Sequence, residues 1–203
     1  MIKLYSFPLS GHAHRAHLML SLLKVEHETI EVNLAEGEQR SENFLKLNPF
    51  HHVPVLEDDG LVIRDSNAII AYLARKYGEQ WYPTDAISTA EIQEWLAVAT
   101  KDIVAGPANA RLVNVFGADM DSEALIANSH ELFTIIEAHL ADKSWFANGT
   151  KSIADVAMYT YIAHAPEGGV SLDAYPNIRA WLKRVEALDG FVAMQKTAVG
   201  LAA

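Results

Sequence analysis

Residues 53–78, VPVLEDDGLVIRDSNAIIAYLARKYG, limit the possible folds most strongly, because two strands, a tight turn and a helix follow one another there. Val53–Leu56 and Leu61–Ile63 flank Asp58-Asp59-Gly60, and an Asp-Gly turn between two apolar runs predicts a β-hairpin. The capping-type pair Asp65-Ser66 then precedes Asn67–Tyr77, where apolar residues fall at helical spacing. The stretch therefore predicts a ββα unit.

Upstream of the hairpin the pattern predicts a βαβ unit and a short helix. Ile2–Phe7 alternates and ends at a proline, Ala13–Lys24 is apolar without a helix breaker, and His27–Asn33 reads as a second strand. Ser41–Leu47 is typical of a short helix stopped by Asn48-Pro49. Residues 1–78 are thus expected to form one βαβ-α-ββα domain.

Downstream, the sequence predicts a linker and then helices alone. Residues 79–86 follow a glycine and carry polar residues and a proline, so they are the expected linker to a helical domain at 87–203. Helical periodicity covers Ile87–Phe116, which Pro107 should kink, and also Ser122–Leu140, Ile153–Ala165 and Tyr175–Leu188. Ser152 and Asp155 have the spacing of a capping box, which we assign to stability.

Composition excludes several classes of function. The formal charge of −10 over 203 residues argues against nucleic acid as a partner. The chain has no cysteine, so any thiol chemistry needs a thiol brought by a ligand. The N-terminus lacks a signal-peptide core and no 18-residue apolar run exists, so we expect a cytoplasmic protein with no membrane partner.

The stretch PLSGHAHRAH, residues 8–17, gathers a serine and three histidines where the first helix should begin. A metal site is disfavoured because His12 and His14 would lie on different helix faces and no carboxylate is near. A serine hydrolase is disfavoured because Ser10 lacks a Gly-x-Ser-x-Gly elbow and an acid to orient a base. His14 and His17 are expected to be ordinary helix residues.

Two further pairs leave alternatives open. Val53-Pro54 could be a trans proline at a sheet edge, or a cis bond that turns the backbone of Val53 outward towards an extended ligand. Asp65-Ser66 could be an ordinary helix cap, or could add a binding site for a carboxylate or phosphate.

Together, YSFPLSGHAHRA, LNPFHHVPVL, DSNAIIAYLARKYG and SIADVAMY resemble the cytosolic glutathione S-transferase family, in the form with a serine-type loop known from bacteria. The resemblance covers nearly the whole chain. It implies a thioredoxin-like N-terminal domain that binds glutathione and an all-helical C-terminal domain that supplies the electrophile pocket.

The resemblance also implies roles for residues of the first loop. Ser10 stands at the position that contacts the glutathione sulfur, with Tyr5 inside the first strand as second choice. His12 is placed to give a second polar contact to the sulfur, and Arg15 is expected to order the first helix rather than touch substrate.

The other glutathione contacts implied by the resemblance come from the opening stretch and the residue before it. Val53 would pair its backbone with the cysteinyl unit, Pro54 would be cis, Ser66 would bind the γ-glutamyl carboxylate, and Asp65 would face the α-amino group. His52 stands where the family often has Gln, Lys or Arg, and an imidazole can still donate to the glycine carboxylate.

The leading function is attack of a glutathione thiolate on a small hydrophobic electrophile, with glutathione as co-substrate and no metal. Asn109, Arg111 and Phe116 are expected in the electrophile pocket, and a homodimer with Phe50 as an apolar anchor is implied. The alternatives are glutathione-dependent peroxide or disulfide reduction, and a non-catalytic binding module on the same fold.

Overall fold

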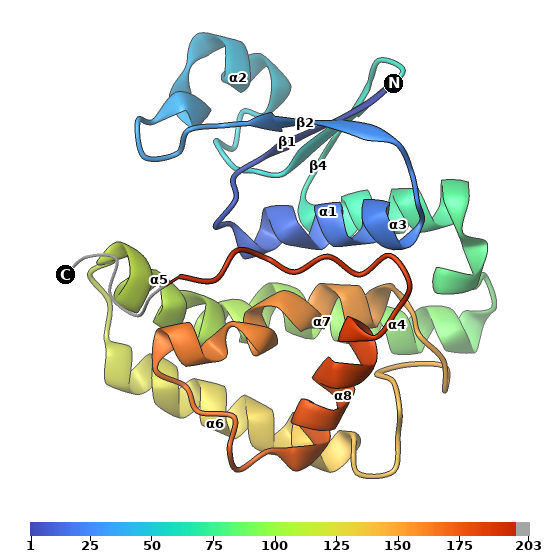
Figure 1. Ribbon diagram of the computed structural model, residues 1–203, viewed down its shortest axis with the longest axis vertical. Coiled ribbons are helices and arrows are strands. Elements are labelled where there is room, and N and C mark those ends of the chain that lie inside the picture. The colour runs from blue at the N-terminus through green and yellow to red at the C-terminus, as the bar shows by residue number, and fades with distance from the viewer. Residues whose placement is uncertain (198–203) are drawn as a thin grey trace.

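A computed structural model of the chain describes residues 1–197. Its strands and helices are β1 (Ile2–Ser6), α1 (Gly11–Leu22), β2 (His27–Glu31), α2 (Glu42–Leu47), β3 (Val55–Asp58), β4 (Leu61–Arg64), α3 (Ser66–Tyr77), α4 (Ala86–Ile103), α5 (Asn109–Phe116), α6 (Ser122–His139), α7 (Ile153–Ala163) and α8 (Pro176–Glu186). Figure 1 shows the sheet and its three helices above a body of helices. The predicted fold class is confirmed, with βαβ-α-ββα followed by helices.

The N-terminal sheet has four strands in the order β2-β1-β3-β4. β1 runs parallel to β2 and antiparallel to β3, as the βαβ unit and the hairpin require. Asp59 and Gly60 both have positive φ, at 48° and 84°, which is the backbone of the predicted tight hairpin turn. Of the two alternatives for Pro54, the proline at a sheet edge does not hold, since Pro54 directly precedes the interior strand β3, outside its ladder of hydrogen bonds.

Helices cover both faces of this sheet. α1 and α3 lie on the face turned towards the helical body, and α2 lies on the other face (Figure 1). A small core of Ala13, Val32, Phe44, Val53 and Val55 is separate from the main one and includes Phe44 of α2. The main hydrophobic core is continuous from α1 and α3 into α4, α6, α7 and α8, so the sheet domain and the helices share it.

The expected long helix from residue 87 to 116 is divided into α4 and α5. Residues Val104–Ala108 form a wide turn in which Gly106 leaves the helical region, with φ −127° and ψ −106°. Pro107 was expected to cause only a kink, but its effect combines with a glycine whose Cα lies so close to α6 that an added Cβ would approach Ser129 Oγ to 3.0 Å. The predicted capping box at Ser152 and Asp155 is present at the start of α7.

After α8 the chain turns back and runs along α1 (Figure 1). Ser21 Oγ donates to Gly190 O at 2.6 Å and a ring nitrogen of His14 lies 2.9 Å from Val192 O, so this segment is tied to the first helix. In residues 1–197 no helix combines the length and the apolar character that crossing a membrane requires.

Candidate functional site

Ser10 is the N-cap of α1, so the helix begins two residues earlier than expected. Its backbone N–H donates to Phe7 O at 3.0 Å, and its Oγ accepts from Ala13 N at 3.2 Å. The cap bond uses a lone pair of the hydroxyl oxygen, which leaves the hydroxyl proton to donate elsewhere. Ser10 is half-buried at a helix N-terminus, where backbone dipoles favour a neighbouring negative charge.

His12 lies beside Ser10 in the first turn of α1. Its Nδ1 is 3.4 Å from Ser66 Oγ and 3.5 Å from Arg15 Nη1, and its ring meets Tyr161 edge-on at 5.1 Å between centroids. Burial, with the nearby positive charge of Arg15, lowers the pKa of His12 to about 3. His12 is therefore a neutral imidazole at any physiological pH.

Arg15 joins α1 to two other helices from a position that is 1% exposed. Nη1 donates to Ser66 Oγ at 2.8 Å and to Asn67 Oδ1 at 2.9 Å, and Nη2 donates to Ala157 O at 2.7 Å. Burial lowers the pKa of Arg15 to about 10, so the guanidinium stays charged at neutral pH. This cation fixes the orientation of the Ser66 hydroxyl.

Asp65 and Ser66 stand at the start of α3. Asp65 has φ 76° and its Oδ1 accepts from Asn67 N at 2.9 Å and Ala68 N at 3.0 Å, so the predicted cap is present. Neither cap bond involves the N–H of Ser66, the first amide of the helix. Asp65 is exposed and Ser66 is 2% exposed, so the aspartate faces solvent above a buried hydroxyl.

The Val53-Pro54 peptide bond is cis, which resolves the alternatives that the sequence left open. Val53 is 8% exposed and His52 is exposed, and Asn48 Nδ2 donates to His52 O at 2.7 Å, which anchors this loop to the end of α2. On neighbouring β1, Tyr5 Oη donates to Glu57 Oε2 at 3.2 Å. Burial and the Glu57 charge raise the pKa of Tyr5, so its proton is committed to that carboxylate.

The three expected pocket residues from the helical part all lie on α5, in different surroundings. Phe116 is 43% exposed and Asn109 is half-buried. Arg111 is only 2% exposed, because Nε pairs with Glu167 Oε2 at 2.5 Å and Nη1 donates to Leu9 O at 2.9 Å. Its side chain therefore lies beneath the Ser10 loop rather than on an open surface.

The family model "Glutathione S-transferase, N-terminal domain" matches residues 1–75, and the model of the C-terminal domain matches residues 115–189. Glutathione S-transferase D7 of Anopheles gambiae is 33% identical over 189 residues, covering 89% of this chain and 84% of the relative. The chain belongs to the glutathione S-transferase family. It is accordingly a transferase enzyme.

Solved transferases share the whole fold. A glutathione S-transferase from Pseudomonas fluorescens has a TM-score of 0.91 at 30% identity, covering 96% of this chain and 99% of the other. A glutathione transferase homologue from Drosophila mojavensis, solved with bound glutathione, has a TM-score of 0.84 at 31% identity, covering 92% and 88%.

Sequence reasoning about this transferase missed Gly11 and Tyr161. A Cβ on Gly11 would lie 2.6 Å from Cζ of Tyr161, so only glycine lets α7 pack against the start of α1. Burial raises the pKa of Tyr161, which is 8% exposed. A glycine directly after the N-cap serine was the available signal, but the sequence could not say what approaches it.

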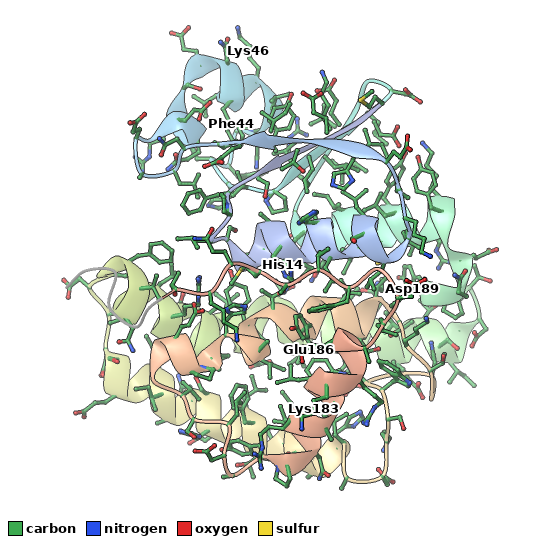
Figure 2. All side chains as sticks on the ribbon, viewed as in Figure 1. His14, Phe44, Lys46, Lys183, Glu186 and Asp189 are labelled. Carbon is green, nitrogen blue, oxygen red and sulfur yellow. The ribbon has the colours of Figure 1, made fainter. Side chains whose placement is uncertain are left out.

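We expected His14 and His17 to be ordinary residues of the first helix, and for His14 this is wrong, because it is buried and hydrogen-bonded. Figure 2 shows His14 on the side of α1 that faces the segment after α8. The histidine is 5% exposed, with Nδ1 2.8 Å from Thr160 Oγ1. His17 is half-buried with its ring 5.5 Å from that of His27. Among residues 1–197 no three or more His, Cys, Asp or Glu residues group so as to hold a metal ion.

Proposed function

We propose that this transferase binds glutathione along one edge of the N-terminal domain, with the sulfur at Ser10. The N–H and hydroxyl of Ser66 would receive the γ-glutamyl carboxylate, and Asp65 would face the α-amino group. The buried Ser66 hydroxyl, oriented by Arg15, supports this assignment. The cap on α3 also leaves the first amide of the helix for an anion.

The rest of glutathione would lie against the loop before β3. The backbone of Val53, next to the cis bond to Pro54, would turn outward and pair with the cysteinyl unit, and His52 would donate to the glycine carboxylate. The exposed imidazole of His52 supports that last contact.

The observation that carries the proposal is the state of the Ser10 hydroxyl. Its oxygen accepts the cap bond from Ala13 N at 3.2 Å, so its proton remains to donate to a thiolate. A free thiol has a pKa of about 8.5, and lowering it by about 2 units takes roughly 2.7 kcal/mol in favour of the anion. A hydrogen bond to a charged acceptor contributes about 1.5 to 3 kcal/mol, and the helix start about 0.3 to 1 kcal/mol. One serine at a helix N-terminus can therefore supply the free energy needed to lower the thiol pKa by about 2 units.

The proposed reaction is conjugation. The thiolate attacks an electrophilic carbon of a hydrophobic substrate, a sulfur–carbon bond forms, and the electron pair leaves with the displaced group or moves to the adjacent acceptor atom. This step needs no metal. Half-exposed Phe116 and half-buried Asn109 support a pocket on α5 that is partly apolar and partly polar, with Arg111 beneath it.

Binding and turnover test the proposal. We expect the protein to be retained on immobilised glutathione and to conjugate members of a panel of electrophiles, with hydroperoxides and glutathionyl disulfides assayed beside them. Ser10→Ala should keep retention and lose most conjugation. Ser41→Ala is the matched control, since Ser41 caps α2 through a bond of the same 3.2 Å length, to Phe44 N. Retention without turnover of any of the three substrate classes would instead indicate a binding module.

The wider organisation is proposed in the same way. We take residues 1–78 as the glutathione domain, 79–86 as the linker and 87–203 as the helical domain, of which residues 198–203 lie outside the described part. A homodimer is supported by Phe50, which is 67% exposed and available as an anchor. A cytoplasmic location is proposed because the reaction needs reduced glutathione.

A further inference from the structure

The peptide group between Leu9 and Ser10 is held at both of its polar ends. Its N–H donates to Phe7 O at 3.0 Å, within the same turn. Its carbonyl accepts from Arg111 Nη1 at 2.9 Å, across 102 residues of chain. Because a peptide group is planar, these two bonds fix its orientation, and with it the direction from which the Ser10 side chain leaves the backbone.

Arg111 is itself held rigidly. Its Nε donates to Glu167 Oε2 at 2.5 Å, and the two side chains are 3% and 10% exposed. Glu167 also accepts from Thr197 Oγ1 at 2.7 Å and lies 2.7 Å from His164 Nδ1. Although burial alone would raise it, the hydrogen bonds from Thr197, Arg111 and His164 lower the pKa of Glu167 to about 2. A charged carboxylate therefore faces the guanidinium throughout the working pH range.

We propose that Arg111 is a positioning residue, which acts through the Leu9 carbonyl to aim the Ser10 hydroxyl at the glutathione sulfur. Within residues 1–197, the other hydrogen bonds of Ser10, from its own N–H and to its Oγ and its carbonyl, all join it to residues within four positions along the chain. The hydrogen bond from Arg111 to Leu9 O connects the helical domain to the peptide group that precedes this serine. The inference rests on the proposed function, because it assumes that Ser10 contacts the sulfur.

Arginine suits this role because its planar fork reaches two acceptors at once. Nε donates to the Glu167 carboxylate while Nη1 donates to the Leu9 carbonyl. A lysine ammonium placed opposite Glu167 cannot make both hydrogen bonds in that geometry. Arg111→Lys therefore keeps the charge opposite Glu167 and releases the Leu9 carbonyl. This makes the substitution specific for positioning.

The test is a double-mutant cycle on the pKa of the bound glutathione thiol, read from the ultraviolet absorbance of the thiolate as pH is varied. We expect Arg111→Lys to raise that pKa by about one unit, a roughly tenfold loss of thiolate at low pH. At pH 6, where the bound thiol is mostly protonated in both proteins, affinity for glutathione should stay within about twofold. The value of kcat/KM should recover at high pH, where the thiol ionises unaided. Arg184→Lys is the matched control, since Arg184 donates to Ser144 O within the helical part.

The double-mutant cycle also distinguishes the positioning role of Arg111 from the proposed role of Ser10. In a Ser10→Ala background, Arg111→Lys should produce no further rise, because the residue acts only through that hydroxyl. An additive rise, or an unchanged pKa in Arg111→Lys while Ser10→Ala raises it, would overturn the positioning role alone. An unchanged pKa in Ser10→Ala would overturn the proposed role of Ser10 and this inference with it. If Arg111→Lys does not fold, Glu167→Gln loosens the same guanidinium and should give a smaller rise in the same direction.

Discussion

His14 makes the stability of the transferase sensitive to acid. The buried imidazole lies between α7 and the segment after α8, with Nδ1 2.8 Å from Thr160 Oγ1 and Nε2 2.9 Å from Val192 O. Val192 O can only accept, so Nε2 carries the proton and Nδ1 accepts from the threonine hydroxyl. The neutral ring is thus fully paired, and burial lowers its pKa from 6.5 to about 4.

The sign and size of the effect follow from linkage. Between pH 6.5 and 4 an unfolded chain protonates His14 and the folded chain does not, so the free energy of unfolding falls as pH falls through that window. With these two pKa values, the contribution lost between pH 7.5 and pH 5 is about 2 kcal/mol. His14→Gln removes the titrating group. The stability advantage of the wild type over this variant should therefore shrink by about 2 kcal/mol over the same interval.

Urea denaturation followed by tryptophan fluorescence, at a fixed protein concentration and at pH 5, 6, 6.5 and 7.5, measures this difference. Burial also lowers the pKa of His12, His17 and His164, so the wild type will lose further stability in acid, and the prediction concerns the difference alone. Thr160→Val removes the same hydrogen bond without removing the titrating group, so it should be less stable but keep most of the pH dependence. A wild-type advantage over His14→Gln that does not change with pH would show that the buried imidazole is not the source of the acid sensitivity.

Three further substitutions test the packing around the site by urea denaturation. Gly11→Ala should lower the free energy of unfolding by about 1 to 3 kcal/mol, because its Cβ would lie 2.6 Å from Tyr161 Cζ. Arg15→Met should cost about 3 kcal/mol, because three acceptors lose their donors, and should also weaken glutathione binding measured by calorimetry. Asp155→Ala should cost about 4 kcal/mol, because it removes the capping box and the acceptor of Trp181 Nε1 at 2.9 Å.

Each of these three has a control and a contrary outcome. Gly11→Ala should cost less in a Tyr161→Leu background, and an equal cost in both would show that the ring is not the obstacle. Arg75→Met, at an exposed arginine, should cost below about 1 kcal/mol, and a cost equal to that of Arg15→Met would contradict the account of the buried cation. Asp121→Ala removes an exposed cap and should cost about 1 kcal/mol, so an Asp155→Ala variant no worse than this would contradict the buried network.

The local features of the fold could be predicted from sequence because their causes are local. An Asp-Gly pair between apolar runs gave the hairpin at Asp59-Gly60, and the spacing of Ser152 and Asp155 gave the cap of α7. Ser10 was expected at a helix start and is the N-cap there. In each case a few neighbouring residues determine the backbone conformation.

What could not be predicted depends on partners far away in the chain. His14 reads as one more residue of an amphipathic helix, but the segment after α8 buries it 178 residues later. Arg111 was expected to line a pocket, yet it is paired with Glu167. The periodicity of apolar residues in a sequence does not show which polar side chains pair with one another in the interior. The division of α4 from α5 likewise depends on the close approach of α6 to Gly106.

A crystal structure of the glutathione complex would show whether the hydroxyl of Ser10 holds the glutathione sulfur. We expect the sulfur within hydrogen-bonding distance of Ser10 Oγ, with the γ-glutamyl carboxylate at the N–H of Ser66 and the cysteinyl backbone on Val53. A complex in which the sulfur instead contacts Tyr5 Oη or His12, with Ser10 bonded only to its own helix, would contradict this expectation.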